Sequence, residues 1–243
     1  MNVFMTISYD GTNYVGWQRQ KRGVSCQQVI EEGLKNLTGE EITVTASGRT
    51  DAGVHAKAQV INFNTQSTIP PKNFYKALNT YLPNDIKATF SKQVDDTFNA
   101  RKSAKKKTYC YTIYYSNTTM PLFDRYAVLE EEKIDAHLLK DASQIFIGEH
   151  DFKCFCASNS SVNSTTRTIY NIDIVENDGL LKIFVTGNGF LYNMVRTLVG
   201  TLIKMARGQL SKQQAQQMLL SKDRTLVGKT YPARGLTLEK VEY

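Results

Sequence analysis

The stretch "EITVTASGRTDAGVHAKAQVINFN", residues 41 to 64, contains two strand-like segments joined by a loop of small residues. "EITVTAS" and "AQVINFN" both carry the β-branched residues that are typical of strands. The loop between them holds Arg49, Asp51 and His55 among side chains no larger than Val. Because Ala, Ser and Gly bury almost no apolar area, packing explains little of this composition. The sequence predicts two strands joined by a loop whose charged residues need another explanation.

Strands and helices are predicted on both sides of this pair. Residues 3 to 9 indicate a strand that runs into the turn "YDG". Ser25 with Gln28 fits the capping box of a helix, and apolar residues then recur at helical spacing as far as Leu37. Further on, "IPPKNFYKALNTYLP" predicts a helix, whereas "DIKATFSKQV" and "TYCYTIYYS" predict strands. The order of elements in this half is β-α-β-β-α-β-β.

The second half repeats this organisation coarsely. "IDAHLLKDASQIFIG" predicts a helix, and strands are expected near residues 168 to 176, 180 to 186 and 236 to 242. A long helix is predicted over residues 189 to 207, followed by a shorter one over 211 to 220. The polar stretch 156 to 167, "CASNSSVNSTTR", indicates a long exposed loop, which is either simply flexible or ordered by a partner.

These elements predict an α/β (α+β) fold made of two RRM/ferredoxin-like modules. Each module would have an antiparallel-rich sheet with helices on one face. We expect residues 1–115 to form the N-terminal module, which carries the Asp loop, and residues 116–243 to form the C-terminal module with the long helix. A cleft between the modules is the expected ligand site.

The charge of the chain favours a polyanionic partner. The net charge is +7 and the isoelectric point is about 9.1. Cationic residues are concentrated in "RQKR", residues 19 to 22, and in "RKSAKKK", residues 101 to 107. Either stretch could instead be a solvated loop or could protect an edge strand.

The sequence argues against several classes of protein. No apolar run reaches the roughly 18 residues needed to span a bilayer, and the N-terminus has the pattern of a strand, so we expect a cytoplasmic protein. The four cysteines suit buried, reduced thiols better than a zinc site with His150, because Cys154 and Cys156 have C-x-C spacing. The chain contains no Walker loop, G-x-G-x-x-G, G-x-S-x-G or H-E-x-x-H motif, which argues against nucleotide hydrolysis, dinucleotide redox chemistry and zinc proteolysis.

Asp51 is the first candidate for chemistry. General turn statistics favour an Asp that hydrogen-bonds its own backbone. A nearby cation such as Arg49 would instead keep the carboxylate ionised and oriented, which suits a nucleophile or a base. His55, without an identifiable partner, is interpreted as a hydrogen-bonded structural histidine.

Three further positions have both a structural and a functional interpretation. Arg196 lies at the flank of the apolar stripe of the long helix, where it either extends to solvent with a buried stem or reaches a ligand. Tyr109 and Tyr111 project from one face of a strand that follows the lysine run, so they either pack across strands or stack on bases. Trp17 is expected to fix a loop, with RNA contact as the alternative. The residues alone indicate a basic, RNA-binding α/β protein but no particular reaction.

Several motifs occur in an order that resembles the tRNA pseudouridine synthase A family. They are "YDGTNYVGWQRQ", "SCQQVIEEGL", "SGRTDAGVHA", "LPNDI", "FNARKSAKKKTYCY", "GNGFLYNMVRTLVGTL" and "ARGLTLEKVEY". The resemblance covers nearly the whole chain. "GRTDAGVHA" is highly specific, and the order of the others makes coincidence improbable.

The resemblance implies an enzyme that isomerises uridine to pseudouridine at positions 38 to 40 of the tRNA anticodon stem and loop. It implies a homodimer that uses no cofactor and no metal. Asp51 would be the catalytic aspartate, and Arg196 would pair with it and keep it charged. Tyr109 would stack on the target uracil and Leu191 would form an apolar wall. Arg49 would help to separate strands or fill the space that the flipped base leaves.

The chain departs from the family pattern at two places. Cys110 replaces a basic residue that relatives often carry between the two tyrosines, and Tyr192 and Asn193 replace a frequent Arg-His pair. These departures bear on the target positions more than on the reaction. Two rival functions are a non-catalytic RNA-binding protein on the same scaffold and a hydrolase that releases the base.

Overall fold

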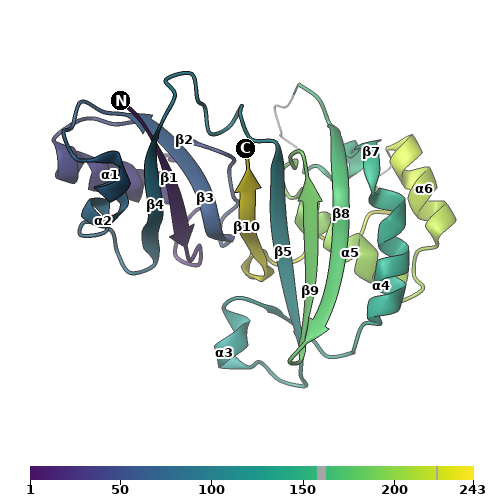
Figure 1. Ribbon diagram of the computed structural model, residues 1–243. Helices are drawn as coiled ribbons and strands as arrows, with labels where there is room; N and C mark the ends of the chain where they lie inside the picture. The colour runs from purple at the N-terminus through teal and green to yellow at the C-terminus, as the bar shows by residue number, and fades with distance from the viewer. Residues whose placement is uncertain (158–162, 223) are drawn as a thin grey trace. The chain divides into compact units, whose positions relative to one another are not determined.

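The computed structural model describes residues 1–157, 163–222 and 224–243. The chain divides into two compact units (Figure 1). Unit 1 consists of Met1–Lys105 together with Thr237–Tyr243, and unit 2 consists of Lys106–Leu236. The mixed α/β class with antiparallel-rich sheets is confirmed.

Unit 1 is a sheet with strand order β4-β1-β3-β10, and β2 pairs with β3. The strands are β1 (Asn2–Tyr9), β2 (Thr45–Ala46), β3 (His55–Asn64), β4 (Ile86–Val94) and β10 (Leu236–Glu242). β10 runs parallel to β3, whereas β1 is antiparallel to both β3 and β4. The helices α1 (Cys26–Thr38) and α2 (Phe74–Leu78) lie together on one side of this sheet, and a 3₁₀ turn at Pro71–Asn73 precedes α2 (Figure 1).

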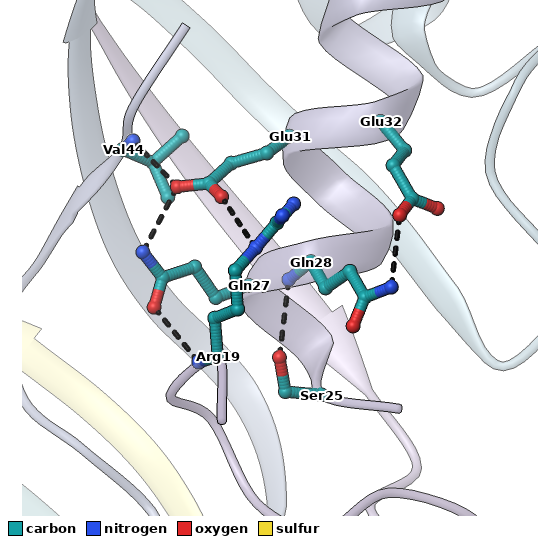
Figure 2. A network of polar contacts seen from close by, with 7 residues as sticks. All are labelled: Arg19, Ser25, Gln27, Gln28, Glu31, Glu32 and Val44. Carbon is teal, nitrogen blue, oxygen red and sulfur yellow. Dashed lines mark hydrogen bonds and ion pairs between the residues drawn. The ribbon is translucent and has the colours of Figure 1, made fainter. Parts of the chain in front are cut away.

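Helix α1 begins and ends at residues that satisfy its terminal backbone groups. The hydroxyl of Ser25 accepts a hydrogen bond from the backbone N–H of Gln28, as the sequence predicts (Figure 2). The side chain of Gln28 does not complete the capping box, because it donates to Glu32 at 2.9 Å instead (Figure 2). Gly39 ends the helix in a left-handed conformation, and Ile30 and Leu34 point into the core.

In unit 2 the strands pair antiparallel in the order β5-β9-β8-β7, and β6 pairs with β5 in parallel. The strands are β5 (Lys106–Tyr115), β6 (Val128–Glu130), β7 (Gly148–Asp151), β8 (Thr166–Asn177) and β9 (Leu180–Gly187). The helices are α3 (Pro121–Asp124), α4 (Ala136–Ser143), α5 (Met194–Ala206) and α6 (Lys212–Ser221). Further 3₁₀ turns lie at Gln144–Phe146, Lys153–Phe155 and Ala233–Gly235. Helices α4 and α5 pack on each other, with α4 against β8 and α5 against β5.

The elements predicted from the sequence occur in the predicted order, but α3, β6 and β7 were not predicted and several bounds differ. The strand expected over 41 to 47 is reduced to β2, and the helix expected over 189 to 207 begins only at Met194. The helix starts late because Asn193 has a left-handed backbone, with φ of 62°, that interrupts helical geometry. Of the loop expected over 156 to 167, residues 158–162 lie outside the described residues, and Thr166 already belongs to β8.

The units divide at a different point from the boundary expected after residue 115. β5 belongs wholly to unit 2, because it pairs with β9 from Lys107 to Tyr114. The last strand, β10, returns to unit 1, where Thr237 and Leu238 pair with β3. The sequence could not show this return, because it depends on a parallel pairing between strands at opposite ends of the chain.

All four cysteines are free thiols in buried positions. Burial raises the pKa of Cys26 to about 12 and that of Cys154 to about 11, so both stay protonated near neutral pH. Among the described residues, no group of three or more His, Cys, Asp or Glu side chains could hold a metal ion. Within the same part of the chain, every helix is too short or too polar to cross a membrane.

Candidate functional site

The loop that carries Asp51 is attached to the sheet at its first residues. Ser47 continues the pairing with β3, because its N–H donates to the carbonyl of Val60 at 2.8 Å. The fully buried side chain of Gln59 accepts from the Ser47 hydroxyl at 2.6 Å and donates to the carbonyl of Gly48 at 2.9 Å. One amide side chain thus fixes two successive residues at the start of the loop.

The backbone on either side of Asp51 is also fixed. The carbonyl of Asp51 accepts from the N–H of Val54 at 3.1 Å, which closes a turn. The Thr50 hydroxyl lies 2.7 Å from the Tyr9 hydroxyl, and the Thr50 carbonyl accepts from the N–H of Trp17 at 3.0 Å. Asp51 itself is half-buried and Arg49 is exposed. The loop is therefore rigid at its backbone while it presents both charged side chains.

Gly16 allows the first motif to approach this loop closely. Its φ of +103° favours glycine, and a Cβ at this position would lie 2.8 Å from the Thr50 carbonyl oxygen. On its other side, the carbonyls of Gly16 and Trp17 accept from the N–H groups of Cys26 and Gln27 at the start of α1. Trp17 is only 2% exposed, which supports the structural interpretation of its indole and not direct contact with RNA.

His55 is a hydrogen-bonded structural histidine at the end of the loop, as the sequence indicated. It is 4% exposed, and its Nδ1 lies 3.1 Å from both the N–H of Gly11 and Oδ1 of Asp10. One ring nitrogen can accept from Gly11 or donate to Asp10, but it cannot do both at once. Either arrangement ties β3 to the "YDG" turn.

The basic loop that contains Arg19 is held by Glu31 (Figure 2). The Arg19 guanidinium pairs with Glu31 at 3.3 Å, and the Arg19 N–H donates to the Gln27 side chain at 3.1 Å. Glu31 also accepts from Gln27 at 2.9 Å and from the N–H of Val44 at 3.2 Å, close to β2. The groove beside this network is about 570 Å³ and is lined by Arg19, Gln27, Glu31, Glu32, Lys35, Glu41, Ile42 and Thr43. With three carboxylates on its walls, this groove does not suit a phosphate.

In unit 2, the two tyrosines of β5 have different surroundings. Tyr109 is 8% exposed, and its ring packs at 88° to the ring of Phe190, with centroids 5.4 Å apart. Tyr111 is fully buried, donates its hydroxyl to the carbonyl of Pro232 at 2.8 Å and meets the ring of Tyr231. Burial raises the pKa of Tyr111. Tyr111 is a packing residue, and Tyr109 is the ring that remains a candidate for ligand stacking.

Arg196 lies near the start of α5 and its guanidinium has fixed partners. One terminal nitrogen donates to Oδ1 of Asn193 at 2.9 Å, and Nε donates to the carbonyl of Tyr231 at 2.6 Å. Leu191, 5% exposed, lies in the turn before α5, where its carbonyl accepts from Met194. Arg196 is half-buried, so its orientation is set by the protein and is not that of a freely extended side chain.

Tyr231, which sequence reasoning did not single out, connects Arg196 to an ion pair. Its hydroxyl donates to Glu130 at 2.8 Å, and the other carboxylate oxygen of Glu130 pairs with Arg207 at 2.7 Å. Burial and the Glu130 contact raise the pKa of Tyr231, so its hydroxyl stays protonated and remains a donor. No local pattern could have indicated Tyr231, because its partners come from three separate elements.

Comparison with known proteins gives matches along the whole chain. A family model described as "tRNA pseudouridine synthase" matches residues 5–113 and 142–243, which include all five candidate site residues. A "tRNA pseudouridine synthase A" from Clostridium acetobutylicum is 44% identical over 242 residues, which cover 100% of this chain and 99% of the relative. A "tRNA pseudouridine synthase A 2" from Clostridium perfringens is 45% identical over the same lengths.

A solved structure described as a "Cbf5-Nop10-Gar1 Complex" aligns with 97% of this chain and 48% of that chain. The TM-score is 0.41 and the sequence identity is 12%. This likeness is too distant to support any detail of the site.

We expect Gly16→Ala to destabilise the protein more than Gly148→Ala. Both glycines have φ of +103°, but a Cβ at Gly148 would meet only His150, at 3.8 Å. The backbone strain of about 1 to 3 kcal/mol is therefore shared, and the clash with Thr50 adds a further cost of about 1 to 3 kcal/mol. Urea unfolding of the two variants measures this difference. Equal losses would show that residue 16 does not need close backbone contact.

Tyr231→Phe should lower the free energy of unfolding more than Tyr111→Phe. The first variant removes a hydrogen bond to a carboxylate, worth about 1.5 to 3 kcal/mol, whereas the second removes a bond to a neutral carbonyl, worth about 1 kcal/mol. Both rings remain in place, so the pair isolates the two hydroxyls. Urea unfolding curves give the comparison, and the reverse order would contradict the proposed link between Tyr231 and Glu130.

Proposed function

This chain belongs to the tRNA pseudouridine synthase family and isomerises uridine in tRNA, and we propose that its targets are positions 38 to 40 of the anticodon stem and loop, with Asp51 as the catalytic residue. The resemblance in the motifs and the family match support this assignment. The same resemblance supports a homodimer and an activity that needs neither metal nor cofactor.

The role of Asp51 is supported by the hydrogen bonds that fix the backbone on both sides of this half-buried residue. Gln59, Tyr9 and Trp17 hold the residues before Asp51, and the turn to Val54 holds those after it. A catalytic group must keep its position relative to the reacting atoms to within a fraction of an ångström. A turn whose Asp only satisfied its own backbone would not need support from three other parts of the chain.

The reaction replaces one bond by another and exchanges one proton with no net release. The bond between N1 of uracil and C1′ of ribose breaks, the base turns, and C5 forms the new bond to C1′. C5 then loses its hydrogen as a proton, and N1 takes up a proton, so no oxidant or co-reactant is needed. Asp51 could attack the sugar, add to the base or remove a ribose proton, and each path requires the ionised carboxylate.

We assign the other candidates to supporting roles. Arg196 would supply the positive charge that keeps Asp51 ionised, since a nearby cation lowers the pKa of a carboxyl group. Its guanidinium is suited to this role because Asn193 and Tyr231 orient it with neutral oxygen atoms. Leu191 would form an apolar wall, and Arg49, exposed on the Asp51 loop, would occupy the space that the flipped base leaves.

Tyr109 would offset part of the cost of removing the target base from its stack. Base flipping costs a few kcal/mol, and stacking on an aromatic ring returns about 1 to 3 kcal/mol per base. The Tyr109 ring packs at 88° to the Phe190 ring, an arrangement that fixes its plane. This packing supports a pre-formed stacking surface.

We expect Asp51→Asn to bind tRNA and to fold normally but to lose turnover. The test uses unmodified tRNA transcripts tritiated at uridine C5, in a buffer with a chelator and no nucleotide. The wild type should release label to water, because C5 exchanges its hydrogen for the bond to ribose. Asp96→Asn, an exposed substitution outside the loop, is the matched control and should release label at the rate of the wild type.

The same assay separates the rival functions. A hydrolase would place the label in free uracil and leave an abasic site, whereas a binding protein would bind the tRNA and release no label. Full activity of Asp51→Asn would remove Asp51 from the catalytic role.

Arg196→Ala should lower both activity and stability. The variant leaves the Tyr231 carbonyl and the Asn193 side chain without their donor, which costs about 1 to 3 kcal/mol of unfolding free energy. Loss of an electrostatic partner at a reacting centre reduces the rate by about 10² to 10³. Arg196→Lys keeps the charge but not both bonds, so it should recover part of the rate. Unchanged melting temperature and tritium release in Arg196→Ala would refute the assignment.

A further inference from the structure

Arg167, at the start of β8, has an unusual set of partners for an arginine. It is half-buried, and one terminal nitrogen donates to the carbonyls of Ser164 at 2.9 Å and Thr166 at 2.6 Å. Within the described residues these are the only hydrogen bonds of its side chain, and it makes no ion pair there. A guanidinium has five N–H donors in a planar fork. The edge formed by Nε and the second terminal nitrogen is therefore left for another acceptor.

The charge of Arg167 is not compensated by a carboxylate among the described residues. Burial lowers the pKa of Arg167, which reflects the cost of keeping a charge partly away from water. Asp151, at the end of the neighbouring strand β7, is already used, because it pairs with Lys222 at 2.7 Å and accepts from the Thr165 hydroxyl at 2.5 Å. An anion bound to Arg167 would supply the missing partner.

The unused edge of Arg167 lies beside the turn that leads to Phe190. A Cβ at Gly189 would be 3.8 Å from Nε of Arg167, so residue 189 adjoins this edge and, being glycine, does not cover it. The next residue, Phe190, packs against the ring of Tyr109. Two hydrogen bonds of 3.0 Å between Thr168 and Asn188 hold β8 to the same turn. The guanidinium thus has a fixed position near the proposed stacking ring.

A second arginine adds positive charge to this region. Arg224 donates to the carbonyl of Cys156, in the segment that follows β7, and β7 pairs with β8 opposite Arg167. Ala157 then donates to the carbonyl of Tyr192 at 3.1 Å, which places this segment beside the turn before α5. Like Arg167, Arg224 has no ion pair with the described residues. Two arginines held by neutral carbonyls keep their full charge for an anion.

We propose that the Nε edge of Arg167, assisted by Arg224, binds a backbone phosphate of the tRNA next to the uridine that Tyr109 receives. The planar fork of arginine matches two phosphate oxygens through two parallel hydrogen bonds. This site rests on the proposed function for the identity of its ligand. It gives the enzyme a contact with the RNA backbone that does not depend on the base, so it positions the target without selecting its sequence.

The test measures the affinity of unmodified tRNA transcripts over a range of salt concentrations. Arg167→Gln should weaken binding and reduce the slope of log K against log salt by about one, the amount expected for one lost phosphate contact. Arg167→Lys should keep most of the slope but bind more weakly than the wild type, because a lysine cannot form the fork. Lys140→Gln, an exposed substitution on α4, is the control for loss of one charge. Circular dichroism confirms that each variant is folded.

A second measurement identifies the phosphate. A series of stem-loop RNAs would each carry a single neutral methylphosphonate at a different position beside the target uridine. One of these RNAs should bind the wild type more weakly than the others. Arg167→Lys should lose that sensitivity in part and Arg167→Gln should lose it entirely. A Gln variant that matches either the wild type or Lys140→Gln in affinity and slope would overturn the site, as would equal sensitivity of all three proteins. These are binding measurements, so a wild type that binds tRNA but forms no pseudouridine would refute the proposed function separately.

Discussion

The close approach of two backbones, at Gly16 and Thr50, is the constraint on which the Asp51 loop depends. The Thr50 carbonyl accepts from Trp17, and Gly16 can lie against this carbonyl only because it has no side chain. The same two residues, Gly16 and Trp17, accept the first N–H donors of α1, groups that a helix otherwise leaves without an intrahelical partner. One short segment therefore accepts hydrogen bonds from the first N–H groups of a helix and also fixes the backbone of the Asp51 loop, whose small side chains provide little packing of their own. The apolar core supports the sheet, but it is this polar contact that places Asp51.

A similar principle operates in unit 2, where backbone carbonyls orient cationic side chains. Arg196 donates to the carbonyl of Tyr231, and the position of Tyr231 is set in turn by Glu130 and Arg207. Asn193 contributes its side chain to Arg196 and its left-handed backbone to the start of α5. Asn is one of the few residues that adopts this conformation at low cost. Asn193 thus has a local structural use in this chain.

The sequence predicted the element order because the periodic patterns that carry it are local. Asp51 could be singled out because a charged residue among Gly, Ala and Ser has little packing role. The supporting residues could not be found in this way. Gln59 and Tyr9 have the pattern of ordinary strand residues, and their function appears only when β1 and β3 bring them beside the loop. The late start of α5 was missed because the apolar spacing continues through the residues before Met194. The left-handed backbone of Asn193 prevents a helix from beginning earlier.

The net charge of +7 does not indicate where an RNA would bind, because many cationic side chains are paired with nearby carboxylates. Arg19 and Arg207 are paired with Glu31 and Glu130, and these pairs hold segments of the chain together. A carboxylate partner orients an arginine but cancels most of its field, whereas a carbonyl orients it and leaves the charge intact. A polyanion should therefore be drawn to the cations that carbonyl groups hold, such as Arg167 and Arg224. Sorting the arginines by the charge of their acceptors separates those that build the fold from those available to a phosphate.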